Sequence, residues 1–177
     1  MTNASAADAA LAQKYLTFEL GTEVYGLDIL RVQEIIGIMP VTRVPQTPSF
    51  VRGVINLRGR VIPVIDLRVK FDTGNAEDTE RTCIVVVQVS GKTSSIMGVV
   101  VDEVSEVVDI ASDRIEATPE FGAGIETDFV RGVGKIGDAV VMLLDIDKVL
   151  SASEIRILKK AASSKPVEEE AKGDDDV

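Results

Sequence analysis

Phe50-Val51-Arg52-Gly53-Val54 occurs a second time, 79 positions later, as Phe129-Val130-Arg131-Gly132-Val133. After each copy the apolar pattern continues in the same register without a gap. A weaker match lies upstream of each copy, where Val24-Tyr25-Gly26-Leu27 corresponds to Ile96-Met97-Gly98-Val99 at an offset of 72 residues. The chain is therefore predicted to consist of two versions of one structural unit.

The apolar periodicity is mostly that of β-strands. Residues 16–20 alternate apolar and polar side chains, which is typical of a strand with one buried face. Residues 84–89 form a nearly continuous β-branched run, as expected of a strand covered on both faces. Each copy of the repeat has two apolar runs around a glycine turn, at Arg58-Gly59 and at Gly137-Asp138, which indicates a hairpin.

Glycines and aspartates stand at equivalent places in the two copies. Gly53 and Gly132 interrupt strands, a position typical of the bulges that curl a small sheet into a barrel. Asp66 and Asp145 end strands and are expected to cap the short helical turns that follow. Residues 147–162 change to a helical period, so the sequence predicts two small β-barrels in tandem and one C-terminal helix.

The predicted domain covers residues 14–162. Its first barrel is expected at roughly 14–75 and its second at roughly 80–150, with an exchange of strands or a helix between them allowed for. Residues 1–13 are small and polar and are expected to form a flexible N-terminus. Residues 163–177 hold six acids against two lysines, which predicts a disordered acidic tail.

Composition argues against several functions. A net charge of −10 repels phosphate backbones, so no nucleic-acid partner is expected. The chain has no histidine, the commonest acid–base catalyst, and it offers neither a zinc-ligand set nor a phosphate-binding loop, so no metal or cofactor is predicted. Cys83 is the only cysteine and is expected to be a buried core thiol. Without a signal-peptide pattern or an apolar run of about 20 residues, a soluble, cytoplasmic protein with no membrane insertion is expected.

Carboxylates are the remaining candidates for catalysis. Asp102-Glu103, Glu106 and Asp109 cluster along the chain, and a carboxylate pair can hydrolyse a glycosidic bond. Their spacing, however, follows turns and the solvent faces of strands, and the chain has no tryptophan to form a sugar platform. A binding module is therefore the stronger interpretation.

Two groups of residues suggest where a partner binds. The first consists of aliphatic side chains that recur in both units beside a glutamate: Val32, Ile35 and Ile36 beside Glu34, and Val104, Val107 and Val108 beside Glu106. If the units are related by an approximate two-fold axis, these segments face each other across a groove; the alternative is barrel core. The second group is the hairpin tip, where Arg58 and Arg60 either clamp carboxylates on a partner or form a solvated turn.

The stretch Phe50–Arg68 resembles the signature of the CheW family of chemotaxis coupling proteins, as do Tyr25–Ile35, Val44–Pro48 and Gly98–Asp102. The resemblance extends over Lys14–Ala162. The same domain also ends the kinase CheA, but this sequence has no phosphotransfer histidine or ATP-binding segment, and it has no room for the receiver domain of CheV proteins. A free-standing adaptor is therefore expected.

The resemblance implies an all-β fold of two five-stranded SH3-like barrels around a shared core. It also implies a non-catalytic adaptor that joins transmembrane chemoreceptors to the chemotaxis histidine kinase in signalling arrays, peripheral to the inner membrane. A similar adaptor for another motility or surface-attachment kinase is the alternative, and a carboxylate-based enzyme is a more distant one. The sequence does not identify the receptors, the kinase or the role of the tail.

The resemblance also implies three contact surfaces. The receptor's helical tip would lie in a groove formed by Val32, Glu34, Ile35, Arg58, Gly59 and Val104. The regulatory domain of the kinase would pack on the first hairpin, through Gly53, Val54, Leu57, Val61, Ile62 and Val64. A second, ring-forming contact would involve Phe121, which lies in a glycine-rich loop.

Overall fold

The computed structural model describes residues 13–73, 77–89, 95–117 and 129–150, together with Glu154, Arg156, Ile157 and Lys160. These last four positions are helical, but most of the predicted C-terminal helix lies outside the described residues. The same holds for nearly all of the N-terminal segment, the whole of the acidic tail, and Phe121.

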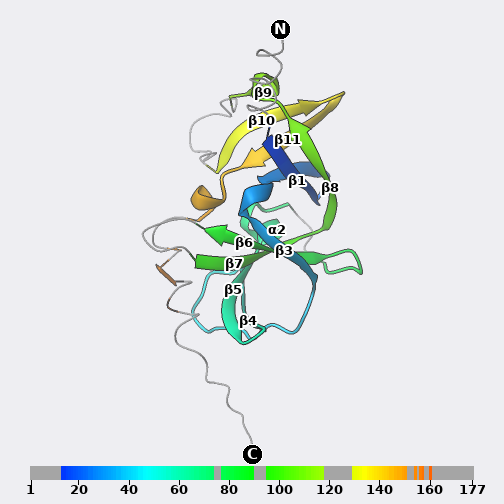
Figure 1. Cartoon of the computed structure of the whole chain (residues 1–177). Coiled ribbons are helices and arrows are strands. Elements are labelled where there is room, and N and C mark those ends of the chain that lie inside the picture. Colours follow the sequence, from blue (N-terminus) through cyan, green and yellow to red (C-terminus); the bar gives the residue numbers. More distant parts are fainter. Residues whose placement is uncertain are drawn as a thin grey trace, which may run out of the picture.

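The described residues form two β-sheets, one above the other in Figure 1, which confirms the all-β class and the two-barrel expectation. The sheet of the first barrel has the order β3-β6-β7-β5-β4 and consists of β3 (Val32–Gly37), β4 (Val51–Leu57), β5 (Arg60–Asp66), β6 (Cys83–Val89) and β7 (Ser95–Val101). The sheet of the second barrel has the order β8-β1-β2-β11-β10-β9 and consists of β1 (Gln13–Leu20), β2 (Glu23–Asp28), β8 (Glu103–Ile110), β9 (Ile115–Glu116), β10 (Val130–Ile136) and β11 (Ala139–Leu144).

Short helical turns connect some of these strands: η1 (Ile29–Arg31), α2 (Leu67–Lys70), η2 (Ser112–Arg114) and η3 (Ile146–Lys148). The second sheet has one strand more than the expected five because β9 forms a two-residue ladder with β10. At the corresponding place in the first sheet, Thr42 makes only an isolated bridge to Val54.

The two repeats exchange their first hairpins. Hairpin β1–β2 belongs to the second sheet, where β2 pairs in parallel with β11, and hairpin β6–β7 belongs to the first sheet, where β7 pairs in parallel with β5. Only Asp102 separates β7 from β8. Since a hairpin needs about two turn residues, so short a link does not fold β8 back beside β7, and the chain passes into the other sheet. Each sheet therefore contains strands from both of the ranges predicted for the barrels, 14–75 and 80–150.

Three hydrophobic cores result from this arrangement. The first barrel encloses one small core around Ile62 and Ile84, and the second barrel encloses another around Tyr15 and Leu143. The largest core lies between the sheets and draws residues from both. Strand β6 shows the consequence, because Ile84 and Val86 face the first barrel's core while its alternate valines face the shared core, as expected of a strand buried on both faces.

The expected turn chemistry is present in both repeats. The Asp66 carboxylate accepts a hydrogen bond from the backbone N–H of Arg68 at 3.0 Å, and Asp145 accepts one from the N–H of Asp147 at 3.1 Å. Strand pairing shifts register at Gly53 and at Gly132, so both glycines mark β-bulges. These confirm the capping and bulge predictions, and they fix where each repeat hairpin ends and bends.

Candidate functional site

The turn between β4 and β5 is joined to strand β3 by an ion pair between Arg58 and Glu34, which we call the tip pair. Strands β3 and β4 are the two outer strands of the first sheet, so the tip pair connects the two edges that close the barrel. Two residues that are 24 positions apart in the sequence, and that were predicted to lie in one binding groove, therefore meet at the surface.

Arg58 occupies an unfavourable backbone conformation. Its φ is 52°, in the left-handed region, and the equivalent residue of the second repeat is Gly137 with φ 59°. The turn is stabilised by the side chain of Asn56, whose Oδ1 accepts the N–H of Gly59 at 2.8 Å. A non-glycine residue in this region costs about 1–2 kcal/mol. The turn of the first repeat therefore has a conformational free-energy cost that glycine avoids in the second repeat. This indicates that the side chain of Arg58 has a functional role.

The other residues of the predicted receptor groove divide into two kinds. Ile35 projects from β3 into solvent, and Gly59 faces open space at the turn. Val32 and Val104, at the starts of β3 and β8, are half-buried and both pack against the shared core. The structure thus gathers Glu34, Ile35, Arg58 and Gly59 on the first barrel, while Val32 and Val104 border the junction of the two barrels.

Most side chains of the predicted kinase surface are buried. Of its six residues, only Leu57 and Val61 offer accessible side-chain surface. The other four, Gly53, Val54, Ile62 and Val64, are buried. The strand pleat turns Ile62 and Val64 into the first barrel's core, where they support the hairpin from inside.

Exposed aliphatic side chains recur at equivalent positions of the two barrels. Ile35 and Val107 are 44% and 48% exposed, and Val61 and Val140 are 37% and 55% exposed. Each pair is related by the offset of its repeat segment, 72 or 79 residues. A large apolar side chain left in solvent at the same place in both units is a conserved feature of the repeat rather than a local packing defect.

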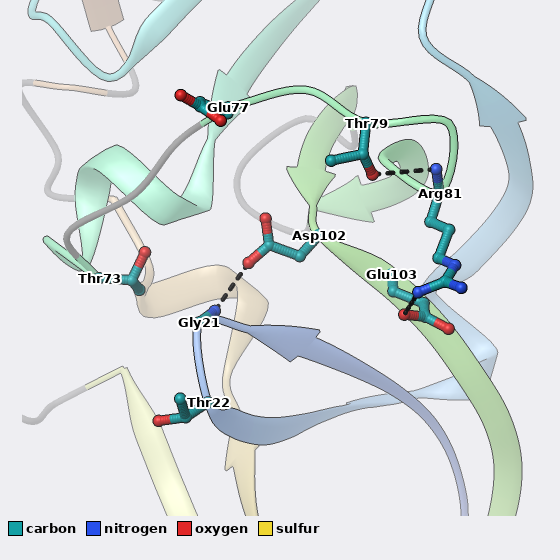
Figure 2. Close-up of a pocket in the computed structure, with 8 residues that line it drawn as sticks. All are labelled: Gly21, Thr22, Thr73, Glu77, Thr79, Arg81, Asp102 and Glu103. Carbon is teal, nitrogen blue, oxygen red and sulfur yellow. Dashed lines mark hydrogen bonds and ion pairs between the residues drawn. The ribbon is translucent and has the colours of Figure 1, made fainter.

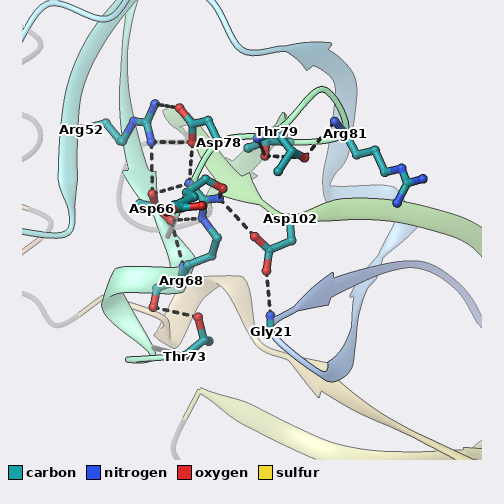
Figure 3. A network of polar contacts seen from close by, with 11 residues as sticks. Gly21, Arg52, Asp66, Arg68, Thr73, Asp78, Thr79, Arg81 and Asp102 are labelled. Carbon is teal, nitrogen blue, oxygen red and sulfur yellow. Dashed lines mark hydrogen bonds and ion pairs between the residues drawn. The ribbon is translucent and has the colours of Figure 1, made fainter. Parts of the chain in front are cut away.

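A buried charge network beneath the first hairpin was not predicted from the sequence (Figure 3). Arg68 is fully buried and donates to Asp66 at 2.9 Å, to Asp78 at 2.7 Å and to Asp102 at 3.1 Å. Arg52 adds a second guanidinium, 2.8 Å from Asp78. The loop between the repeats is therefore held in place at Asp78, although its composition resembles that of a simple linker.

The network shifts the pKa values of Asp78 and Arg68. Hydrogen bonds from Arg52, and further ones from Arg68, outweigh partial burial and lower the pKa of Asp78 to about 2. Burial alone would lower the pKa of Arg68, but its bonds to three aspartates raise it overall. These shifts favour the charged forms of Arg68 and Asp78.

Asp102 links this network to the second barrel. Its Oδ1 accepts from Arg68, and its Oδ2 accepts the backbone N–H of Gly21, in the β1–β2 turn, at 2.7 Å. Beside it lies a hollow of about 470 Å³ (Figure 2). Its lining residues are Gly21, Thr22, Thr73, Glu77, Thr79, Arg81, Asp102 and Glu103.

Three of the four carboxylates considered as catalysts have structural partners. Asp102 is engaged on both oxygens, and Asp109 forms an ion pair with Lys14 at 2.8 Å. Glu103 lies 3.9 Å from Arg81. Within the described residues, no group of three or more acidic or cysteine side chains is placed to hold a metal ion. Cys83 is half-buried rather than fully buried, and burial raises the pKa of its thiol.

Comparisons with known proteins bear on this surface. A family model described as "CheW-like domain" matches residues 14–154. Chemotaxis protein CheW of Klebsiella aerogenes is 40% identical over 158 residues, which cover 89% of this chain and 93% of that protein. Chemotaxis protein CheW of Rhizobium meliloti is 34% identical over 154 residues, covering 87% and 97%. The crystal structure of scaffolding protein TtCheW from Thermoanaerobacter tengcongensis matches with a TM-score of 0.72 at 35% identity, covering 80% of this chain and 94% of that one.

Proposed function

The chain belongs to the CheW family, and on this basis we propose that it is a non-catalytic adaptor that couples transmembrane chemoreceptors to the chemotaxis histidine kinase in signalling arrays. The described part of the chain has no helix with the length and apolar character needed to cross a bilayer. We therefore place the protein in the cytoplasm, at the inner membrane only through the receptors that it binds.

The observation that carries the proposal is the tip pair. A surface-exposed arginine in a left-handed turn is held by Glu34 beside exposed Ile35, which gives a charged and an apolar contact on one small area. Interaction hot spots commonly combine an arginine with apolar side chains in this way. The receptor's helical tip would contact this area and extend toward Val32 and Val104, with Gly59 allowing close approach.

The kinase's regulatory domain would bind the same hairpin from its accessible side, at Leu57 and Val61. The second ring contact, at Phe121, remains a sequence-based proposal. The adaptor itself performs no covalent step. It biases the kinase between active and inactive states because it binds those states with different affinity when the receptor shifts. Contacts of micromolar strength, about 8 kcal/mol each, suffice when an array presents many of them together.

The test is calorimetric titration of the full chain with the isolated regulatory domain of the kinase. Val61→Asp places a charge on the accessible hairpin surface, and its repeat counterpart Val140→Asp places the same charge on an exposed site of the second barrel. We expect Val61→Asp to weaken kinase binding at least about tenfold, because a desolvated charge without a partner is costly, and Val140→Asp to bind normally. The reverse result would move the kinase to the second barrel.

The receptor side is tested with a peptide or fragment that forms the receptor's helical tip. Arg58→Ala should weaken its binding while the thermal unfolding midpoint changes by only a few degrees, because the tip pair is exposed. Unchanged receptor affinity would remove Arg58 from the receptor surface. Failure of the wild-type chain to bind either partner would refute the proposed function while leaving the fold intact.

A further inference from the structure

Arg60 differs from Arg58 in having no ion-pair partner among the residues that the structure describes. It is the first residue of β5, and it lies directly across the ladder from Leu57. Its side chain is exposed, and within the part of the chain that the structure describes it makes no hydrogen bond or ion pair. Arg58, two residues earlier, has its charge compensated by Glu34. Of the two arginines at the tip, only Arg60 therefore presents an uncompensated positive charge.

This charge stands out against the rest of the molecule. The chain as a whole carries −10, whereas Arg58, Glu34 and Arg60 together make the hairpin tip positive by one charge. A partner surface that bears a carboxylate is attracted at this point and repelled by much of the remaining surface. Such a contrast fixes the register of a complex and raises its association rate more than it raises the bulk affinity.

The neighbours of Arg60 indicate which partner it meets. Of the two accessible side chains of the predicted kinase surface, Leu57 is the cross-strand partner of Arg60 and lies on the same face of the hairpin, whereas Val61 follows Arg60 in β5 and projects from the other face. The tip pair, in contrast, faces strand β3 and the predicted receptor groove. The hairpin thus carries a compensated arginine on the receptor side and a free arginine among the kinase contacts.

The second repeat lacks this arrangement. Ala139 and Gly137 occupy the positions that Arg60 and Arg58 have in the first repeat. The exposed aliphatic residue is kept, since Val140 occupies the position of Val61. Lys135, the cation nearest the turn of that hairpin, is 2.5 Å from Glu116. The two barrels therefore share the apolar position and differ in the free charge beside it. A charge difference of this kind lets similar surfaces select different partners.

We propose that Arg60, and not Arg58, is the residue with which this protein recognises a carboxylate on the regulatory domain of the kinase. This inference rests on the proposed function, because it names the chemistry that one of its two partners must present. A guanidinium meets a carboxylate through two parallel N–H···O bonds, so the partner's acid should lie beside an apolar patch that accepts Leu57, the cross-strand neighbour of Arg60.

The experiment measures the dissociation constant for the kinase's regulatory domain at low and at moderate salt, with the receptor tip titrated in parallel. Arg60→Gln removes the free charge. Arg114→Gln is the matched control, since Arg114 is an exposed arginine of the second barrel whose side chain has no recorded partner among the described residues. The double variant Glu34→Gln/Arg58→Gln removes the tip pair while it leaves the net charge unchanged.

We expect Arg60→Gln to weaken kinase binding about five- to tenfold at low salt and to flatten the salt dependence, because rim charges act on association through a screened field. Arg60→Lys should restore part of both. Arg114→Gln should bind like the wild type, and the double variant should keep the Arg60-dependent salt response while it loses receptor affinity. Equal thermal midpoints would show that all variants are folded.

Four results would overturn the inference. If Arg60→Gln left the kinase affinity unchanged, Arg60 would be an ordinary solvated residue. The proposed function would still stand as long as the wild type binds the kinase. An effect of Arg60→Gln on receptor binding alone would assign the carboxylate to the receptor. If deletion of residues 163–177 tightened kinase binding of the wild type but not of Arg60→Gln, the chain's own acidic tail would be the occupant. No kinase binding by the wild type would refute both proposals together.

Discussion

Gly53 is the residue at which the repeat hairpin tolerates substitution least, and Gly53→Ala tests why. Its φ is +139°, a conformation that residues with a Cβ rarely adopt. A Cβ built there would stand 2.0 Å from the carbonyl oxygen of Thr42. The same oxygen accepts the N–H of Val54 at 2.8 Å, and the N–H of Thr42 donates to the Val54 carbonyl at 2.9 Å. The methyl group therefore strikes the bridge that closes the edge of the first barrel.

The expected cost follows from these contacts. Backbone strain at a position that requires glycine costs about 1–3 kcal/mol. Loss of the two bridge hydrogen bonds costs about 1 kcal/mol each. Gly53→Ala should therefore lower the free energy of unfolding by about 3–5 kcal/mol, which corresponds to a fall in the unfolding midpoint of roughly 10 °C for a chain of this size.

The assay is urea and thermal unfolding followed by circular dichroism, with Gly37→Ala as the matched control. Gly37 also lies in a strand of the first barrel, but its φ is ordinary and a Cβ there would meet nothing within 4 Å. Its substitution should change the stability by no more than about 0.5 kcal/mol. If Gly53→Ala were within 1 kcal/mol of this control by the same measurement, the backbone argument would be wrong. The role of Gly53 would then have to be sought in partner contact.

Two further predictions concern the charges around this hairpin. Arg58→Gly and Arg58→Ala both remove the tip pair, but only glycine relieves the left-handed turn, so the glycine variant should be the more stable by about 1 kcal/mol in the same unfolding assay; equal stability would show that the turn is unstrained. Because the pKa of Asp78 is lowered from 3.8 to about 2, its contribution to stability is complete above pH 3.8 and is lost as the pH falls toward 2. The side chain of Asp78 is 38% exposed, so solvent screening limits this contribution to about 1 kcal/mol, and Asp78→Asn should flatten the acid limb of a stability–pH curve by that amount.

Local structure could be predicted from the sequence because its causes are local. A glycine that breaks an apolar run, or an aspartate that ends one, acts on its immediate neighbours. The bulge at Gly53 and the cap at Asp66 could therefore be predicted without knowledge of the fold. The two residues of the tip pair were predicted to lie in one binding groove. Their direct contact depends on closure of the barrel, so the spacing of Glu34 and Arg58 in the sequence could not predict it.

Burial within the hairpin could not be predicted for a different reason. In a strand with both faces covered, every residue is apolar, so hydrophobicity does not tell an inner face from an outer one. Val64 and Val61 look alike in the sequence, yet the first is fully buried and the second is a surface residue. The charge network was missed because its centre, Arg68, corresponds to Asp147 in the second repeat, so comparison of the repeats gave no signal of a common function.

That reversal of charge bears on how the chain selects the exchanged fold. The two connections that cross between the sheets are both fastened by ion pairs. Arg31, after β2, bonds Asp147 of the second barrel at 2.6 Å, and it also donates to a backbone carbonyl of the first. Asp102, after β7, bonds Arg68 of the first barrel and the Gly21 N–H of the second.

The two ion pairs have their charges the opposite way round. In one the crossing segment supplies the arginine, and in the other it supplies the aspartate. Arg31 and Arg68 belong to the first repeat, while Asp102 and Asp147 belong to the second. Each crossing therefore joins an arginine of the first repeat to an aspartate of the second, and the two ion pairs stabilise the exchanged arrangement. Because each barrel then lacks two strands without the other, the tip pair on one barrel and the exposed valines on the other are held in a fixed relation, as an adaptor between two partners requires.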